Sequence, residues 1–349
     1  MERVSFTPAP SPRRRRFLFG TLATLAAVAA PWPGPGVGAQ ERAHRIAFAN
    51  VTEEPGVTIE GTGFTGRDVR ESFALAARSH GAEIVYYDNQ RDNARALANA
   101  EDAIAKKVDL YVLYHRDAAT NAAIVGKLSA AGIPVLAINH AAAGAPLYTI
   151  DNLAAGRVAG EALGEFAARN WRAQNKLAVV LGPVAAQAER IPERVQGITE
   201  GLKRHLPSTR VVMLDTQGNP AQAGPLLGKL VQAHPGSKFL IAATDDATAL
   251  AAKAALESAG RLQDGAIVGH GVDRSIHGGI NERKEIDPNN RGSIVIGSVA
   301  FYLDRAGYDV LPIALGILEG RAAAPRTAVA HRLITAGNVF VEYPPYDMN

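Results

Sequence analysis

Short apolar runs alternate with longer amphipathic segments along most of this chain. Residues 135–138, Val-Leu-Ala-Ile, are apolar without alternation, which is typical of a strand covered on both faces. In residues 67–80, Val69, Phe73 and Ala76 recur at helical spacing. Because strand and helix keep alternating, the pattern predicts βαβ units with right-handed crossovers and parallel sheets.

The alternation predicts two α/β lobes. We expect strands at residues 45–51, 83–87, 110–114, 135–138, 177–181, 210–214, 239–243, 266–269 and 293–296. We expect helices at residues 67–80, 94–106, 118–131, 153–171, 194–205, 221–233, 247–259 and 301–318. About ten strands are many for one open sheet, so two lobes of about five strands are the more economical arrangement. The first lobe is complete near Asp151.

Polar residues follow several of these strands. Asn139 and His140 come directly after residues 135–138, and Tyr114 and His115 end the third strand. In open α/β sheets, ligands bind in the crevice beyond the carboxyl ends of the strands. The sequence therefore predicts a polar binding site at these strand ends.

Residues 1–39 have the features of an export signal. Arg13 to Arg16 form a charged start, residues 17–30 are apolar, and Val37-Gly38-Ala39 is a small-residue cleavage site. The run Arg14-Arg15-Arg16-Phe17-Leu18 fits the twin-arginine pattern, although an ordinary secretory signal with additional arginines remains the alternative. No second long apolar run follows, so we expect no transmembrane helix.

The composition excludes several kinds of binding and catalytic site. The net charge is only +3 and includes the arginines of the leader, so nothing in it requires nucleic acid or an anionic membrane. The chain has no cysteine, which excludes disulfides, thiolate metal sites and thiol nucleophiles. No Gly-x-Ser-x-Gly or His-Glu-x-x-His motif is present, so the sequence has no motif that supports a hydrolase.

From about residue 45 to residue 341 the sequence resembles a known family, on several motifs in order: Ala130-Ala131-Gly132-Ile133-Pro134-Val135, Asp151-Asn152-Leu153-Ala154-Ala155-Gly156, Arg194-Val195-Gln196-Gly197-Ile198 and Thr244-Asp245-Asp246. It is similar to the periplasmic substrate-binding proteins of sugar ABC transporters, of the ribose- and galactose-binding type. The resemblance implies the type I fold of these proteins, with two doubly wound parallel-sheet lobes joined by a hinge. It places residues 40–151 and about 299–327 in the N-terminal lobe, and residues 152–298 and about 328–349 in the C-terminal lobe.

The resemblance also implies what the protein does. It implies a monomeric periplasmic receptor that captures a sugar or polyol in the cleft, closes by a hinge motion and delivers its ligand to a membrane permease. Such a receptor has no catalytic residues, metal or cofactor and does not bind nucleic acid. A sensor kinase or chemoreceptor in place of the permease is the variant of this hypothesis.

The ligand contacts of the family map onto residues of both lobes. Asn139 and His140 stand where the family has an Asp-Arg pair, so the specificity must differ. The full set of candidate ligand-binding residues is Phe64, Tyr114, His115, Asn139, His140, Arg194, Asp245, Asp273 and Ser298. Carboxylates, amides and guanidinium groups satisfy sugar hydroxyls, and an aromatic face covers the apolar side of the ring.

Structural roles compete with these assignments. Asp245 is also a good N-cap for the helix near Ala247, and Arg194 also suits a solvated helix face. Phe64 could be a core residue beneath an inserted loop, and His140 could pack against the hinge.

Two other functions use residues of the same region. Gly61 to Gly66 read as G-x-G-x-x-G, with Asp88 further along the chain, which suggests an exported NAD(P)-dependent sugar oxidoreductase. However, Glu53 to Glu60 separate these glycines from the first strand, which breaks the tight strand-to-helix turn of that motif. His115, His140 and His270 end predicted strands and could bind zinc, but they lack a compact ligand spacing.

Overall fold

The structure is a computed structural model that describes residues 43–184, 191–278 and 282–343. The chain from Ala43 onward forms one compact unit by itself. The expected export signal, residues 1–39, lies outside the described residues. None of the helices in the described ranges is both long and apolar enough to cross a membrane.

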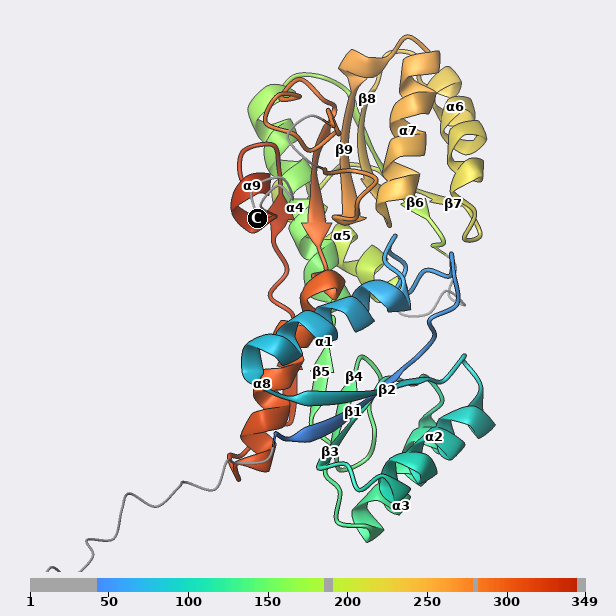
Figure 1. The fold of residues 1–349 in the computed structure, drawn as a ribbon. Coiled ribbons are helices and arrows are strands. Elements are labelled where there is room, and N and C mark those ends of the chain that lie inside the picture. The colour runs from blue at the N-terminus through green and yellow to red at the C-terminus, as the bar shows by residue number, and fades with distance from the viewer. Residues whose placement is uncertain (1–42, 185–190, 279–281, 344–349) are drawn as a thin grey trace, which may run out of the picture. The chain divides into compact units, whose positions relative to one another are not determined.

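The first lobe is built on a parallel sheet with the strand order β11-β5-β4-β3-β1-β2 (Figure 1). Its strands are β1 (Arg45–Asn50), β2 (Glu83–Asp88), β3 (Leu110–Leu113), β4 (Val135–Ile138), β5 (Leu147–Thr149) and β11 (Arg326–Ala328). Its helices are α1 (Gly66–His80), α2 (Asn93–Ala105), α3 (Ala118–Ala130) and α8 (Ala306–Leu318), the last preceded by the 3-10 turn η3 (Leu303–Arg305).

Alternating side chains of the first sheet build two cores. Ile46 and Phe48 of β1 belong to the cluster that includes Phe73 of α1 and residues of α8. Ala47 and Ala49 belong instead to the cluster with α2 and α3. Successive residues of a strand face opposite sides of its sheet, so helices cover both faces. This is the doubly wound arrangement that the continuous apolar runs predict.

The second lobe repeats the plan with the strand order β12-β10-β9-β8-β6-β7, in which only the β10–β12 pair is antiparallel. Its strands are β6 (Lys176–Gly182), β7 (Val211–Asp215), β8 (Lys238–Ala243), β9 (Gly265–Gly271), β10 (Val295–Ala300) and β12 (Leu333–Ile334). Its helices and turns are α4 (Asn152–Asn170), α5 (Ile191–His205), η1 (Pro220–Gln222), α6 (Ala223–Ala233), α7 (Asp246–Ser258), η2 (Leu262–Asp264) and α9 (Val339–Glu342).

The chain passes from one lobe to the other after β5, β10 and β11. The predicted class, two doubly wound parallel-sheet lobes, is confirmed. Each described sheet has six strands instead of about five, because β5, β11 and β12 are too short to produce a recognisable apolar run.

The C-terminal third needs two corrections. The strand expected at residues 293–296 is β10, which spans Val295–Ala300. The helix expected from residue 301 begins only at Ala306, after the 3-10 turn η3. Gly297 and Ser298 lie inside β10 although their residue types suggest a turn, and residues 301–302 continue the passage between lobes.

Candidate functional site at the strand ends

Four of the predicted residues lie together where β3 and β4 end. Tyr114 and His115 follow β3, and Asn139 and His140 follow β4, its neighbour in the sheet. The rings of Tyr114 and His140 are stacked, with their centroids 6.2 Å apart. The parallel register therefore brings these side chains to one edge of the first sheet, as predicted.

Asn139 holds this edge in shape. Its φ of 58° is in the left-handed region, which asparagine tolerates better than most residues. Its Oδ1 accepts a hydrogen bond from the backbone N–H of Ile150 at 3.0 Å, and its Nδ2 donates to the Tyr114 hydroxyl at 3.2 Å. The amide thus ties β4 to the start of the passage between lobes and orients Tyr114.

Glu60, which the sequence analysis did not single out, is the central acid of this group. It lies in the loop of residues 51–65 between β1 and α1, at a turn where Glu60 and Gly61 both have positive φ. Its Oε1 accepts a hydrogen bond from the Tyr114 hydroxyl at 2.6 Å and lies 3.6 Å from His140 Nε2. Burial by itself raises the pKa of Glu60, but contact with His140 and Tyr114 and the charge of Arg116 together lower it to about 2.

Two imidazole nitrogens of these strand-end residues have no hydrogen bond of normal length among the described residues. They are His115 Nδ1 and His140 Nε2, and the latter still faces the Glu60 carboxylate at 3.6 Å. The other nitrogen of His115, Nε2, is 2.9 Å from Asn93 Oδ1, which fixes the ring. His115 is only 2% exposed, and burial lowers its pKa, so the neutral imidazole is favoured.

Arg194 connects the two lobes. It belongs to α5, whose glycines pack directly on those of α4: a Cβ on Gly156 would overlap the backbone carbonyl of Arg194, and Gly197 lies equally close to Leu153. This close approach places the guanidinium beside Asn152, whose Oδ1 accepts from Nε at 3.1 Å and from Nη2 at 2.8 Å.

The remaining donors of Arg194 bind backbone carbonyls from both lobes. Nη2 donates to Glu60 O and Nη1 to Gly61 O, each at 2.9 Å, and Nη1 also donates to Thr244 O. The guanidinium carbon lies 4.5 Å from the centroid of the Phe301 ring. A guanidinium has five N–H groups, and these contacts use all of them. Arg194 is therefore a buried clamp on the loop of residues 51–65 and not a solvated helix residue.

In the second lobe, the predicted acids surround one that was not predicted. Asp246, fully buried at the start of α7, accepts hydrogen bonds from the Ser298 hydroxyl at 2.6 Å and from the backbone N–H of Asp273 at 2.9 Å. Burial and the negative charge of Asp273 raise the pKa of Asp246 to about 8. The preceding residue, Asp245, caps α7 through the backbone N–H of Thr248 at 2.7 Å.

The first lobe reaches this group through Gly63, because a Cβ there would overlap Asp273 Oδ2. Phe64, the next residue, is 5% exposed and packs in the same core cluster as Phe48 and Phe73. His270 is fully buried in β9, and its Nδ1 is 2.7 Å from the carbonyl oxygen of Ala243. The strand ends of the two lobes thus meet through the loop of residues 51–65.

This architecture agrees with the comparisons to known proteins. The model of the periplasmic binding protein domain matches residues 56–320, which is most of the chain. The chain belongs to this family. A search of curated proteins finds no match.

Several solved structures share the fold of this periplasmic binding protein. One is GanP, a glucose-galactose binding protein from Geobacillus stearothermophilus, with 18% identity and a TM-score of 0.60 over 86% of this chain and 99% of that one. Another is a solute-binding protein from Bacillus halodurans with bound myo-inositol, with 17% identity and a TM-score of 0.63 over 86% and 96%. A third is the fructose-binding periplasmic domain of a hybrid two-component system, with 18% identity and a TM-score of 0.60 over 86% and 93%. At these identities the likeness establishes the fold.

The structure also bears on the other two hypotheses. In this periplasmic binding protein, residues 51–65 separate β1 from α1, so Gly61 does not form the turn after the strand that a dinucleotide fingerprint requires. Within the described ranges, no three histidine, aspartate or glutamate side chains are grouped so that they could hold a metal ion.

Proposed function

We propose that this protein is an extracytoplasmic receptor that captures a sugar or polyol between its lobes and delivers it to an ABC-type permease. The observation that carries the proposal is the group at the strand ends of the first lobe. It combines the buried Glu60 carboxylate with His140 Nε2 and His115 Nδ1, which have no hydrogen bond of normal length in the described part of the chain.

These groups suit hydroxyl-rich ligands. Each sugar hydroxyl both donates and accepts a hydrogen bond, so it can donate to an ionised carboxylate or pair with an imidazole nitrogen. A buried polar atom without a partner costs about 1–3 kcal/mol, which a ligand hydroxyl would offset. The solved neighbours described with glucose-galactose binding and with bound myo-inositol support the same ligand class.

The roles of the nine predicted residues differ within this proposal. Tyr114, His115 and His140 contact the solute together with Glu60, whereas Asn139 orients Tyr114. Arg194 and Asp245 have structural roles, as clamp and helix cap, because their side chains form hydrogen bonds within the chain. Contact of Phe64, Asp273 and Ser298 with the solute stays a prediction.

Export and partnership belong to the same proposal. The run Arg14-Arg15-Arg16-Phe17-Leu18 supports export through the twin-arginine pathway to the periplasm. Capture of a sugar requires closure of the lobes on it, and the passages after β5, β10 and β11 are the segments that act as the hinge. The proposed receptor works as a monomer without a cofactor, catalyses no reaction and does not bind nucleic acid.

A thermal-shift screen of the purified protein tests the binding step. The panel contains monosaccharides, myo-inositol, sugar acids and NAD(P). A ligand that binds only the folded state raises the unfolding midpoint by mass action, so one sugar or polyol should raise it. His140→Ala should abolish that rise, whereas His80→Ala, which changes an exposed histidine at the end of α1, should keep it. A rise with NAD(P) alone would contradict the receptor and favour the oxidoreductase.

A sensory role is the second candidate. The fructose-binding neighbour is part of a two-component system, so the same fold also serves a kinase. Deletion of the gene distinguishes the two partners. Loss of solute uptake with an intact transcriptional or chemotactic response supports the permease, and the reverse result supports the sensor.

A further inference from the structure

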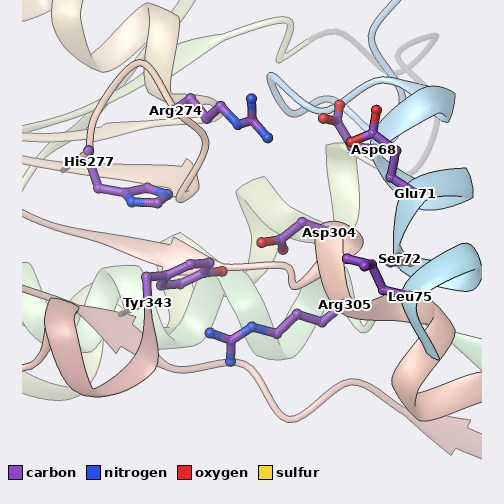
Figure 2. A pocket seen from close by; sticks show the side chains of 10 residues that line it. Asp68, Glu71, Ser72, Leu75, Arg274, His277, Asp304, Arg305 and Tyr343 are labelled. Carbon is purple, nitrogen blue, oxygen red and sulfur yellow. The ribbon is translucent and has the colours of Figure 1, made fainter. Parts of the chain in front are cut away.

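A polar cavity lies apart from the strand-end group. It measures about 230 Å³, and none of its lining residues belongs to the set around Glu60 and Arg194. Asp68, Glu71 and Leu75 of α1 form one wall (Figure 2). The opposite side comes from the second lobe, with His277 after β9 and Tyr343 at the end of α9.

Two buried oxygen atoms in this cavity have no hydrogen-bond partner among the described residues. They are the hydroxyl of Tyr343 and Oδ1 of Asp304, and Figure 2 shows the hydroxyl directed toward the Asp304 carboxylate. Tyr343 is only 6% exposed. Burial raises the pKa of both groups, that of Asp304 to about 6, so the carboxylate is mostly ionised at pH 7.5.

The Tyr343 ring is held rigidly. It stacks on Tyr302 with centroids 5.9 Å apart and contacts the His277 ring at 4.7 Å. The Arg305 guanidinium lies 4.6 Å from its centroid. Because aromatic and cationic neighbours fix the ring, the hydroxyl cannot turn away to find another partner. The cavity therefore presents a fixed pair of polar groups.

One alcohol group placed between the two oxygen atoms would satisfy both. It can donate its proton to Asp304 Oδ1 and accept the proton of the Tyr343 hydroxyl at the same time. Asp68 and Glu71 oppose an anionic ligand, and the nearby Arg274 and Arg305 oppose a cationic one. The lining therefore favours a neutral molecule that carries several hydroxyls.

The volume limits the size of that molecule. At about 230 Å³ the cavity is larger by roughly half than one of about 150 Å³ that holds benzene, so it accepts roughly nine heavy atoms. We propose that this cavity is a second binding site, for a small neutral polyol of the size of a triol or tetritol, bound through Asp304 and Tyr343. The inference stands on this cavity and does not require a solute at the strand ends.

Calorimetric titration of the purified protein with glycerol and with erythritol at pH 7.5 tests the site. Asp304→Asn should weaken erythritol binding roughly tenfold or more, because it removes a charged acceptor. Tyr343→Phe should weaken it about two- to tenfold, because it removes one neutral hydrogen bond. Neither oxygen bonds to the described protein, so both variants should fold with an unfolding midpoint at or above that of the unmodified protein.

Two controls separate this site from the strand ends. Tyr308→Phe alters a tyrosine of α8 that is 43% exposed and should leave erythritol binding unchanged. His140→Ala should also leave it unchanged, even where it abolishes binding of the transported sugar. The proposal is overturned if erythritol does not bind, if neither cavity variant weakens it, or if His140→Ala alone abolishes it. A crystal soaked in erythritol should place the ligand between Asp304 and Tyr343.

Discussion

Glu60 and Asp246 are both buried carboxylates at the strand ends, one from each lobe, and their pKa values shift in opposite directions. Burial raises the pKa in both cases, because a low-dielectric surrounding disfavours the charged form. At Glu60, contact with His140 and Tyr114 and the charge of Arg116 outweigh burial and lower the pKa to about 2. Asp246 faces a second carboxylate, Asp273, so its pKa rises to about 8.

The comparison shows that burial raises the pKa of both carboxylates, and that their neighbours decide whether this rise is reversed, as at Glu60, or increased, as at Asp246. At neutral pH the first lobe presents an ionised acceptor, and the second lobe holds an acid that keeps its proton. The clamp formed by Arg194 holds the two carboxylate groups in place relative to each other, because it binds carbonyls from each lobe.

Substitution of Arg194 should have the largest effect on stability, because the contacts of this residue join the two lobes. Arg194→Ala leaves the carbonyls of Glu60, Gly61 and Thr244 without their donor and should lower the free energy of unfolding by about 3–5 kcal/mol. Urea denaturation measures the change. Arg169→Ala, at an ion pair whose arginine side chain is 71% exposed, should cost less than about 1 kcal/mol. Equal effects of the two variants would exclude the clamp.

Removing the charge of Glu60, the ionised carboxylate of the first lobe, should have the next largest effect on stability. Glu60→Gln should lower the free energy of unfolding at pH 7 by on the order of 1–3 kcal/mol, because the pKa of Glu60 falls from 4.5 to about 2 on folding. A lowered folded pKa gives stability above the unfolded pKa that is lost as the pH falls through the folded one. Urea denaturation at pH 7 and at pH 2 should therefore show a difference from the unmodified protein that shrinks at low pH.

Glu54→Gln changes an exposed glutamate of the same loop and is the matched control. It should have little effect on the free energy of unfolding at either pH. A loss in Glu60→Gln that is the same at pH 7 and pH 2 would show that the Glu60 carboxylate is not held in its ionised form.

Replacing Asp246, the protonated acid of the second lobe, should change stability in the opposite direction. The folded pKa of Asp246 is above its unfolded value, so its contribution to stability is present at low pH and is lost as the pH rises toward about 8. Asp246→Asn should therefore raise the free energy of unfolding at pH 8 and have little effect at pH 4, because asparagine cannot take up the buried negative charge. In an Asp273→Asn background the gain should shrink, because the repelling charge is already gone. A loss of stability at pH 8 would contradict this.

The smallest effect on stability is expected where the loop of residues 51–65 contacts the second lobe. Gly63→Ala places a methyl group against the Asp273 carboxylate, so that buried side chain must move, at a cost of about 1 kcal/mol. Gly126→Ala, in α3 with open space around it, should instead stabilise the protein slightly through helix propensity. Thermal unfolding of both variants shows whether the loop of residues 51–65 contacts the second lobe in solution.

The sequence predicts the sheets well where a strand is a continuous apolar run, as in β4 and β8. It fails at β5, β11 and β12, because strands of two or three residues carry no period. It also misplaces β10, because Gly297 and Ser298 interrupt the apolar pattern although both lie within the strand. Register and pairing, which tertiary contacts fix, decide these elements.

The candidate site was only partly predictable for a related reason. Tyr114, Asn139 and His140 were found because strand ends are visible in the sequence. Glu60 was missed, because it lies in a loop without periodicity and reaches Tyr114 only through a turn with positive φ. Asp246 was missed because its neighbour Asp245 accounts for the acidic residue expected as a helix cap.

The clamp formed by Arg194 has a consequence for the evolution of specificity. Its contacts with the loop go to the carbonyls of Glu60 and Gly61, and every amino acid carries a carbonyl. If the proposed function holds, substitutions at position 60 therefore change which solute groups are recognised while the loop stays anchored. The same scaffold would then acquire a different ligand specificity by mutation of one loop, without loss of the contacts that hold the lobes together.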